Sequence, residues 1–509
     1  MDFSLNSITF TAAAVAVIIG ISCMKFAREV FLKKGKRYAP VVGTVFQLLV
    51  NLPGLHDYMT GISAKHRTYR FLNLFRSDVY ISDPANVEYI LKTNFANYGK
   101  GWVHHDILKD LLGDGIFTVD GEMWRTQRKT SSHEFSTKIL REFSSEVFRS
   151  NAGKLAQVVS EAATAKQSID VQELFMKSTL ESVFKVMLGV DIDSVHGKNE
   201  AGILFTKAFD DASVLTLYRY LDIFWRIKRF LNIGSEAKLR ACIQVIDKFI
   251  YEIIRSKTTQ NQSSQHDSLI KKGDILSRLL ESNETDPKYL KDIILSFTIA
   301  GKDTTAITLS WFLYMMCKHP EVQEKIAQEV FEAIEVTENL SLDEIVASIS
   351  EEALDKMQYL HAALTETLRL YPAVPVDGKI CLSDDTLPDG VSVRRGDQVA
   401  YQPYAMGRMK RLWGDDAEEY RPERWLNEDG EFKPESSFKF TAFQAGPRIC
   451  LGKEFAYRQM KIFSAVLLSS FIFKLSDEQK VVNYKTNLTL QVDGALHLRA
   501  FHRLPHKYA

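Results

Sequence analysis

The spacing of apolar residues divides the chain into helical and extended stretches. Residues 67–82 alternate apolar and polar side chains, a pattern that predicts a short sheet. From Pro84 to Tyr371 apolar residues recur at helical spacing, and Pro372 ends the last helix because it cannot donate the next backbone hydrogen bond. Residues 385–401 and 473–501 return to short strands separated by turn residues. The pattern therefore predicts a mainly α-helical protein with small β-sheets near both ends.

Two segments within the helical stretch depart from a simple pattern. Residues 256–273 are polar and predict an exposed loop between two helices. Residues 218–231 predict a helix that mixes aromatic and basic side chains. Such a helix either lies on a membrane surface or packs over the core as an ordinary amphipathic helix, and the sequence leaves both possibilities open.

The N-terminal stretch predicts a membrane anchor. Residues 3–24 carry no charge and are long enough to span a bilayer. Six cations and only one anion follow within residues 25–37, which predicts that the body of the protein lies on the cytosolic side. A cleaved signal peptide fits less well because Met1 and Asp2 provide no positive charge before the apolar run. We expect an anchor at residues 1–24 and a basic linker at residues 25–39.

Composition narrows the class of protein. The 509 residues include 64 cationic and 64 anionic side chains, a balance that argues against nucleic acid as the main partner. Five cysteines in a chain of this length do not form a disulfide framework, so the body is expected in a reducing compartment. The length alone suggests about three domains. However, no Pro/Gly/Ser-rich linker divides residues 40–509, which are therefore expected to form one domain.

Cys450 has the most informative surroundings of any residue in the chain. It lies just before a helix predicted over residues 453–469, and backbone N–H groups at a helix N-terminus stabilise a thiolate. Gly446 and Gly452 let the backbone approach a flat ligand, and Arg448 offers a forked donor for a carboxylate. A haem has carboxylates, a flat face and an iron that accepts cysteine. A buried structural role, usual for free cysteine, is expected instead for Cys23, Cys242, Cys317 and Cys381.

Residues 443–452 match the pattern Phe-x-x-Gly-x-Arg-x-Cys-x-Gly, which begins at Phe443. At these positions the chain resembles the cytochrome P450 haem-thiolate monooxygenases. The resemblance implies the cytochrome P450 fold over residues 40–509 and haem b with Cys450 as its axial thiolate. It also assigns Phe443, Gly446, Arg448 and Gly452 to the binding of this cofactor.

A second set of chemical groups lies in a long apolar helix predicted over residues 289–318. Ala300-Gly301-Lys302-Asp303-Thr304-Thr305 is expected to interrupt this helix, because glycine and threonine weaken a helix interior. Asp303 then offers a proton source beside the Thr304 hydroxyl, although a solvent-facing polar patch would have the same composition. The segment resembles the oxygen-activation segment of the family, which implies catalytic roles for Asp303 and Thr304. Ala300 replaces the glutamate that links haem covalently in many animal fatty-acid ω-hydroxylases, so we expect non-covalent haem.

Glu366 and Arg369 are spaced to share one helix face, which by itself usually means a surface ion pair. The resemblance implies more, because Glu-x-x-Arg is a motif of the family. In the family this motif pairs with the arginine of a Pro-Glu-Arg-aromatic segment, which is Arg424 of Pro422–Trp425 in this chain. The implied role of Glu366, Arg369 and Arg424 is structural.

Trp124 and Arg128 lie one helical turn apart, so an indole N–H and a guanidinium can reach one carboxylate. They match the Trp-x-x-x-Arg motif of the family, which implies contact with a haem propionate. Lys379 lies where many relatives have a further arginine, and its role stays open. His104 and His105 are predicted to be loop residues rather than ligands.

The resemblance implies a monooxygenase that uses O₂ and electrons from NADPH. Because no Gly-rich dinucleotide fingerprint is present, a separate flavoprotein reductase is expected as partner. A basic docking face for it is expected around the ligand loop, from Arg448, Lys453, Arg458 and Lys461. Residues 404–414 and 443–453 resemble the plant fatty-acid ω-hydroxylase branch. This likeness predicts terminal hydroxylation of long-chain fatty acids by an enzyme anchored in the endoplasmic reticulum membrane.

Three alternatives remain at this level. The substrate could be another lipophilic molecule, such as a sterol, a terpenoid or a xenobiotic. A haem-thiolate isomerase or dehydratase would need neither O₂ nor a reductase, but such enzymes usually lack the acid–alcohol pair seen at Asp303 and Thr304. A membrane-anchored haem-binding protein without catalytic activity would need no oxygen activation.

Overall fold

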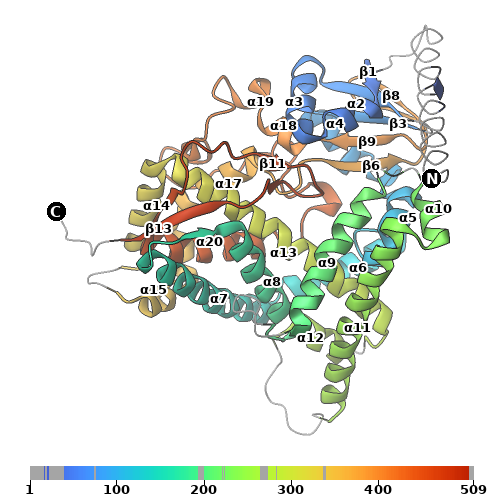
Figure 1. The fold of residues 1–509 in the computed structure, drawn as a ribbon. Helices are drawn as coiled ribbons and strands as arrows, with labels where there is room; N and C mark the ends of the chain where they lie inside the picture. Colours follow the sequence, from blue (N-terminus) through green and yellow to red (C-terminus); the bar gives the residue numbers. More distant parts are fainter. Residues whose placement is uncertain are drawn as a thin grey trace, which may run out of the picture. The chain divides into compact units, whose positions relative to one another are not determined.

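The computed structural model describes residues 39–503, except 74–75, 193–199, 221, 223, 264–272, 283 and 336–339, together with Val17, Gly20, Ile21 and Met24. The fold is mainly helical with small sheets, as the sequence predicted (Figure 1). The predicted anchor and basic linker lie outside the described residues, apart from those four residues and Ala39. Within the described part of the chain, no helix is both long and apolar enough to cross a membrane.

The chain forms two compact units, each assembled from separate stretches of sequence. The first unit comprises residues 1–101, 375–418 and 436–449, and the second comprises residues 102–374, 419–435 and 450–509. This division places Arg448 in the first unit and Cys450 in the second.

A six-stranded sheet with the order β1-β2-β3-β9-β6-β4 organises the first unit. Its strands are β1 (Val41–Thr44), β2 (Thr68–Leu72), β3 (Ser77–Ile81), β4 (Tyr98–Gly99), β6 (Asp377–Cys381) and β9 (Gln398–Tyr401). β2 and β3 are antiparallel, with Arg70 opposite Val79, which confirms the sheet predicted over residues 67–82. β7 (Asp385–Thr386) and β8 (Ser392–Val393) form a separate hairpin, and β6 begins before the region in which strands were predicted.

Short helices accompany this sheet and cover its apolar side chains. They are α2 (Val45–Val50), α3 (Leu55–Lys65), α4 (Pro84–Glu88), α18 (Pro403–Gly407) and α19 (Lys410–Trp413). The sheet contributes Tyr69, Phe71 and Ala400 to one buried cluster, and α3 adds Met59. Burial of these apolar side chains is the main source of stability for a sheet of such short strands.

Helices make up most of the second unit. They are α5 (Gly101–Leu112), α6 (Gly121–Phe135), α7 (Lys138–Thr164), α8 (Val171–Leu188), α9 (Glu200–Tyr218), α10 (Trp225–Leu231), α11 (Gly234–Ser263), α12 (Ile275–Glu281), α13 (Pro287–Lys318), α14 (Pro320–Ala333), α15 (Leu342–Ser348), α16 (Glu351–Lys356), α17 (Gln358–Leu370) and α20 (Lys453–Ser470). Of these helical residues, only Gly101, the first residue of α5, is assigned to the first unit. The strands of the second unit are β5 (Ser168–Asp170), β10 (Phe471–Leu475), β11 (Tyr484–Lys485), β12 (Gln491–Val492) and β13 (His497–His502). The strands after residue 470 confirm the sheet predicted near the C-terminus.

α13 is the central helix of this unit and packs along α8 (Figure 1). Asp286 caps its N-terminus by accepting a hydrogen bond from the backbone of Lys288, and Pro287 is suited to the first turn. The helix runs without a break through residues 300–305, so the predicted interruption was wrong, although a threonine hydroxyl does bond the backbone one turn earlier, from Thr304 to Ala300. A Cβ on Gly301 would lie 2.7 Å from Val183 Cγ2 of α8. Close packing of two helices, rather than a break, thus explains the glycine, and this packing outweighs the low helix propensity.

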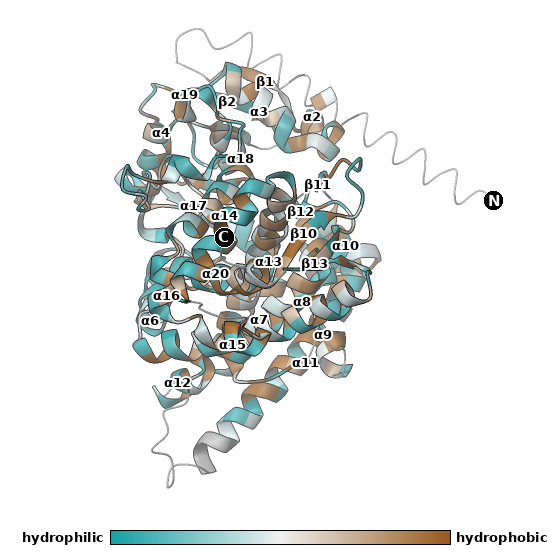
Figure 2. Ribbon diagram, turned by 90° about the vertical axis from the view of Figure 1, so that its left-hand side faces the viewer, coloured by the Kyte–Doolittle hydropathy of each residue, from teal (hydrophilic) through white to brown (hydrophobic). Residues whose placement is uncertain are grey.

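Two other sequence predictions need correction. α11 continues to Ser263. Its buried residues Leu239, Ile246, Ile250 and Ile254 recur at helical spacing, and hydrophobic and hydrophilic colours alternate along this helix in Figure 2. Residues 256–263, predicted to belong to an exposed loop, are therefore helical, and residues 264–272 lie outside the described residues. The single helix predicted over residues 218–231 is instead the end of α9, a turn, and α10.

Candidate functional site

The segment before Cys450 makes a tight turn in the first unit. Residues Gly446–Arg448 form one turn of 3₁₀ helix, and Gly446 has φ of 67°. A Cβ on Gly446 would lie 2.0 Å from the backbone oxygen of Leu91, so no other residue fits there without a shift of the backbone. Arg448 is buried, whereas Phe443 is partly buried. The predicted glycine requirement thus has a steric cause at Gly446.

Cys450 follows directly and precedes α20, whose N-cap is Gly452. Its side chain is exposed, unlike that of Cys381, which is buried. Although the residue is accessible, the protein around it partly desolvates the sulfur and so raises the pKa of the Cys450 thiol, while the Gly452 N–H and the charges of Arg128 and Lys453 act in the opposite direction. An accessible sulfur that accepts a backbone hydrogen bond fits a metal ligand, because a coordinating metal ion deprotonates the thiol.

Trp124 and Arg128 both lie on α6, one turn apart, as the sequence predicted. Trp124 is buried and Arg128 is partly buried. Burial lowers the pKa of Arg128, whereas the neighbouring Cys450 raises it. The structure therefore brings Arg128 near the cysteine, so that a cation lies beside the sulfur.

The middle of α13 carries a narrow accessible face. Between Asp292 and Leu313 every residue is buried except Ile299, Ala300, Gly301, Asp303 and Thr304. Gly301 packs on α8, so the accessible face consists of the other four residues. Their positions correspond to i, i+1, i+4 and i+5, which lie on one side of a helix.

Two polar side chains lie on this accessible face of α13. Thr304 Oγ1 donates a hydrogen bond to the backbone oxygen of Ala300, one turn earlier. Asp303 Oδ1 lies 3.2 Å from the ammonium of Lys302. An acid and an alcohol thus lie together on the only accessible face in the centre of this helix.

Glu366 is the centre of a buried polar cluster. Arg369 donates two hydrogen bonds of 2.7 Å to the two oxygens of this carboxylate, and Arg424 Nε lies 3.4 Å from Oε1. The structure therefore brings together the three residues that the sequence singled out. Sequence reasoning missed two further donors to the same carboxylate, the indole of Trp425 at 2.9 Å and the backbone N–H of Arg421 at 2.9 Å. The aromatic position of the Pro422–Trp425 segment was the available signal for Trp425.

Lys379 is a buried residue of β6, and its contacts were not predicted. Its ammonium lies 2.7 Å from Asp377, which also contacts Lys100 at 3.3 Å and accepts a hydrogen bond from Tyr401. Burial lowers the pKa of Lys379 to about 7, and the charges of Lys100 and Arg448 act in the same direction, against that of Asp377. The position that the sequence left open is thus occupied by a lysine with a carboxylate partner inside the first unit.

The prediction that His104 and His105 are loop residues was wrong, because both lie on α5. His104 Nδ1 lies 2.7 Å from the hydroxyl of Tyr220, and His105 Nε2 lies 2.9 Å from Asp114. Both contacts link parts of the second unit.

The basic face expected around the ligand loop is smaller than predicted. Lys461 is buried and donates a hydrogen bond to the backbone oxygen of Leu354. Arg458 forms an ion pair of 3.1 Å with Glu351. Both side chains therefore have partners within the second unit, because α20 packs against α16 and α15 instead of facing solvent on this side.

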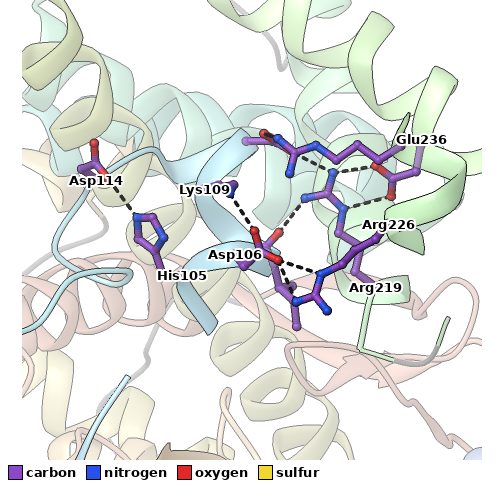
Figure 3. A network of polar contacts seen from close by, with 10 residues as sticks. His105, Asp106, Lys109, Asp114, Arg219, Arg226 and Glu236 are labelled. Atoms are coloured by element: carbon purple, nitrogen blue, oxygen red, sulfur yellow. Dashed lines mark hydrogen bonds and ion pairs between the residues drawn. The ribbon is translucent and has the colours of Figure 1, made fainter. Parts of the chain in front are cut away.

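A network of charged residues joins α5 to α10 and α11 (Figure 3). At its centre Arg219 donates to both oxygens of Glu236, to Asp110 and to the backbone oxygen of Ile107, over distances of 2.6–2.9 Å. At its edge Arg226 lies 2.9 Å from Asp106. The sequence showed aromatic and basic residues in this region and gave no indication of the partners of the basic ones.

Taken together, a mainly helical fold with an accessible cysteine at the start of a helix and an acid–alcohol pair on a central helix defines a haem-thiolate protein. The chain belongs to the cytochrome P450 family, because the family model described as cytochrome P450 matches residues 34–498. It is therefore a monooxygenase with a haem-thiolate cofactor.

Similar proteins come from plants. The chain is 48% identical to cytochrome P450 704C1 of Pinus taeda, over 97% of each chain. It is 44% identical to cytochrome P450 704B1 of Arabidopsis thaliana, over 87% of this chain and 90% of the relative. Identity to cytochrome P450 86B1 of Arabidopsis thaliana is 35%, over 98% of this chain and 91% of the relative. Such coverage includes both compact units.

Proposed function

We propose that this monooxygenase hydroxylates the terminal carbon of long-chain fatty acids. The observation that carries the chemistry is the accessible Cys450 thiol with a hydrogen bond from Gly452 at the start of α20. The substrate class is supported by the likeness of residues 404–414 and 443–453 to the plant fatty-acid ω-hydroxylase branch and by the plant origin of the similar proteins.

In this proposal Cys450 would supply the thiolate that holds the haem iron, and the haem would be held without a covalent link to residue 300, which is alanine. Bound haem with a thiolate ligand supplies the oxygen activation that inserts an oxygen atom into an unactivated C–H bond. Trp124, Arg128 and Arg448 bind the propionates, since a guanidinium and an indole N–H suit a carboxylate. Phe443, Gly446 and Gly452 shape the ligand loop.

Asp303 and Thr304 hold and transfer protons on the accessible face of α13. The Thr304 hydroxyl, oriented by its bond to the Ala300 carbonyl, keeps its lone pairs available as an acceptor. Asp303 supplies the proton as a general acid. Glu366, Arg369 and Arg424 have a structural role, because their charges pair with one another within the buried cluster.

The location of the protein is part of the same proposal. Residues 1–24 form a single anchor in the endoplasmic reticulum membrane, residues 25–39 form a basic linker, and residues 40–509 form the cytosolic catalytic domain. Exposed apolar side chains on α10 support contact of this helix with the membrane: Ile227 is 57% exposed, Phe230 88% and Leu231 55%. Electrons come from a separate NADPH-dependent flavoprotein reductase.

Reconstitution tests the substrate. The purified full chain is mixed with a flavoprotein reductase and NADPH, and fatty acids of graded chain length are offered, with mass spectrometry of the products. We expect the terminal alcohol as the main product. Products hydroxylated only within the chain would contradict terminal attack. Turnover of sterols or terpenoids but of no fatty acid would contradict the substrate class, and turnover without NADPH would indicate an isomerase or dehydratase.

Spectroscopy tests the ligand separately. Cys450→Ser should abolish the thiolate-specific red shift of the reduced carbon monoxide complex. Cys242→Ser, which changes another cysteine of the second unit, is the matched control and should leave the spectrum unchanged. A red shift that survives Cys450→Ser would refute the assignment. Acid extraction should release the haem from the chain.

A further inference from the structure

Lys302 is a buried cation next to the proposed proton source. Its side chain is only 4% exposed, although it lies on α13 beside the accessible face that carries Asp303 and Thr304. A buried ammonium needs a compensating charge, because moving it out of water is costly. Two carboxylates provide this compensation, and they come from different helices.

The two carboxylates share one ammonium. Lys302 Nζ lies 3.2 Å from Asp303 Oδ1 and forms a second ion pair with Asp210 on α9. Although burial disfavours its charge, Asp303 and Asp210 raise the pKa of Lys302, which therefore stays charged. The backbone at Lys302 is also fixed, because Thr179 of α8 donates a hydrogen bond of 3.0 Å to its carbonyl oxygen.

The two partners differ in their access to water. The side chain of Asp303 is 13% exposed, whereas that of Asp210 is 49% exposed. Burial raises the pKa of Asp210, the charges of Asp303 and Asp211 add to this effect, and Lys302 opposes it. Asp210 can therefore exchange protons with solvent and take one up more readily than an ordinary aspartate.

We propose that Lys302 is a positioning residue whose hold on Asp303 is set by Asp210, so that a solvent-accessible carboxylate on α9 controls the proton source on α13. When Asp210 is ionised, it shares the ammonium, and Asp303 is held less firmly. When Asp210 is neutral, the full charge of Lys302 acts on Asp303 and attracts that carboxylate more strongly. This proposal rests on the role given to Asp303 above.

Few other groups in the described part of the chain compete for this cation. α9 adds Asp211, which is exposed and acts on Asp210. α11, which packs on α9, adds the thiol of Cys242, whose pKa burial and Asp211 raise. α8 contributes the Thr179 hydroxyl. The balance at Lys302 is therefore mainly between Asp210 and Asp303.

Two substitutions should act in opposite directions. Lys302→Met releases Asp303, so that the acid keeps its proton to higher pH. Asp210→Asn removes the second carboxylate, so that the Lys302 ammonium pairs with Asp303 alone and Asp303 loses its proton at lower pH. The measured quantity is the pH midpoint of coupling, the fraction of NADPH electrons found in product rather than in hydrogen peroxide. We expect a rise of about one pH unit for Lys302→Met and a fall of about half a unit for Asp210→Asn.

Glu200→Gln is the matched control, since it removes an exposed carboxylate at the start of the same helix, α9, that does not act on Lys302 or Asp210, and it should leave the midpoint within the error of the measurement. Shifts of Lys302→Met and Asp210→Asn in the same direction, or no shift in either, would overturn the proposal. If Lys302→Met does not fold, Lys302→Gln replaces it. Any substrate that is turned over suffices, so failure of fatty-acid hydroxylation does not affect this test.

A second measurement does not depend on activity. Urea unfolding of Lys302→Met, Asp303→Asn and the double variant gives the coupling between the two residues. The same cycle in the Asp210→Asn background should give a coupling constant larger by about twofold or more. An equal or smaller coupling there overturns the sharing of Lys302. A pH profile unchanged by Asp303→Asn overturns the inference and the role of Asp303, but leaves the monooxygenase assignment intact.

Discussion

Two ionic clusters of the second unit use the same residue types in different surroundings. Around Glu366, the carboxylate and Arg369 are both fully buried, and backbone and indole N–H groups complete the hydrogen bonds. Around Arg219, burial is graded: its side chain is 2% exposed, but Arg226 at the edge of the network is 57% exposed (Figure 3). The first cluster joins α17 to residues 419–425, and the second joins α5, α10 and α11.

The difference shows why the number of ion pairs says little about their roles. A buried pair whose remaining hydrogen bonds are satisfied is costly to break, because the surviving charge is stranded. An exposed pair contributes little, since water and salt screen it. We infer that the Glu366 cluster is permanent, whereas the edge of the Arg219 network can open at small cost.

The largest effect is expected for Glu366→Gln. Loss of this charge leaves the buried guanidinium of Arg369 without its carboxylate, which should cost about 3–5 kcal/mol in the free energy of unfolding. Urea unfolding and the yield of haem-containing protein measure the effect. Glu423→Gln is the control, because this residue is half-exposed and pairs with Lys325, and it should cost less than about 1 kcal/mol. Equal costs for the two variants would remove the distinction between buried and exposed clusters.

Arg219→Met should have an intermediate effect. The variant leaves Glu236 buried and charged, but Asp110 retains its pair with Arg229, so we expect a loss of about 1.5–3 kcal/mol. Adding Glu236→Gln removes the stranded charge, and the double variant should cost less than the sum of the two single ones. Additive losses in urea unfolding would show that the two residues do not act as a pair.

Acid should weaken the second unit through His361, a residue of α17. Burial, together with the charges of Lys461 and Lys453, lowers the pKa of His361 to about 3. Since an unfolded histidine titrates near 6.5, the unfolded state binds more protons below this pH, and stability falls as the pH drops from 6.5 towards 3. We expect a loss of about 2 kcal/mol at pH 5, since the unfolded pKa lies about 1.5 units above this pH and one unit corresponds to about 1.4 kcal/mol. His361→Phe should reduce the slope of stability against pH, and an unchanged slope would contradict the assignment.

The smallest effect is expected at the exposed edge of the Arg219 network. Arg226→Ala removes an ion pair with Asp106 and a contact with the ring of Trp102, 5.4 Å from its guanidinium carbon. The expected cost is below about 1 kcal/mol, and high salt should reduce it further. Unfolding measured at low and high ionic strength tests this expectation. A cost as large as that of Arg219→Met would mean that the edge is as tightly held as the centre.

Sequence reasoning was most successful where neighbouring residues decide the structure. The helix predicted over residues 453–469 is α20, and Tyr371 follows the end of α17 as Pro372 implied. Glu366 and Arg369 meet because they lie three residues apart on one helix, whereas Arg424, 58 positions away from Glu366, was expected beside them only from the resemblance to the family. It failed where packing decides, as at Gly301, whose expected break in the helix is instead a close contact with Val183.

By itself, the sequence determined the mainly helical class, the family and the cysteine that carries its chemistry, because these depend on periodicity and on motifs within about ten residues. Outside the motifs of the family, only the tertiary structure decided which charges meet. Lys302 pairs with Asp210 across 92 positions of sequence, and Arg219 reaches Asp110 across 109. Such pairs arise when helices pack and bury long side chains, so their partners are set by the geometry of the fold and leave no local pattern.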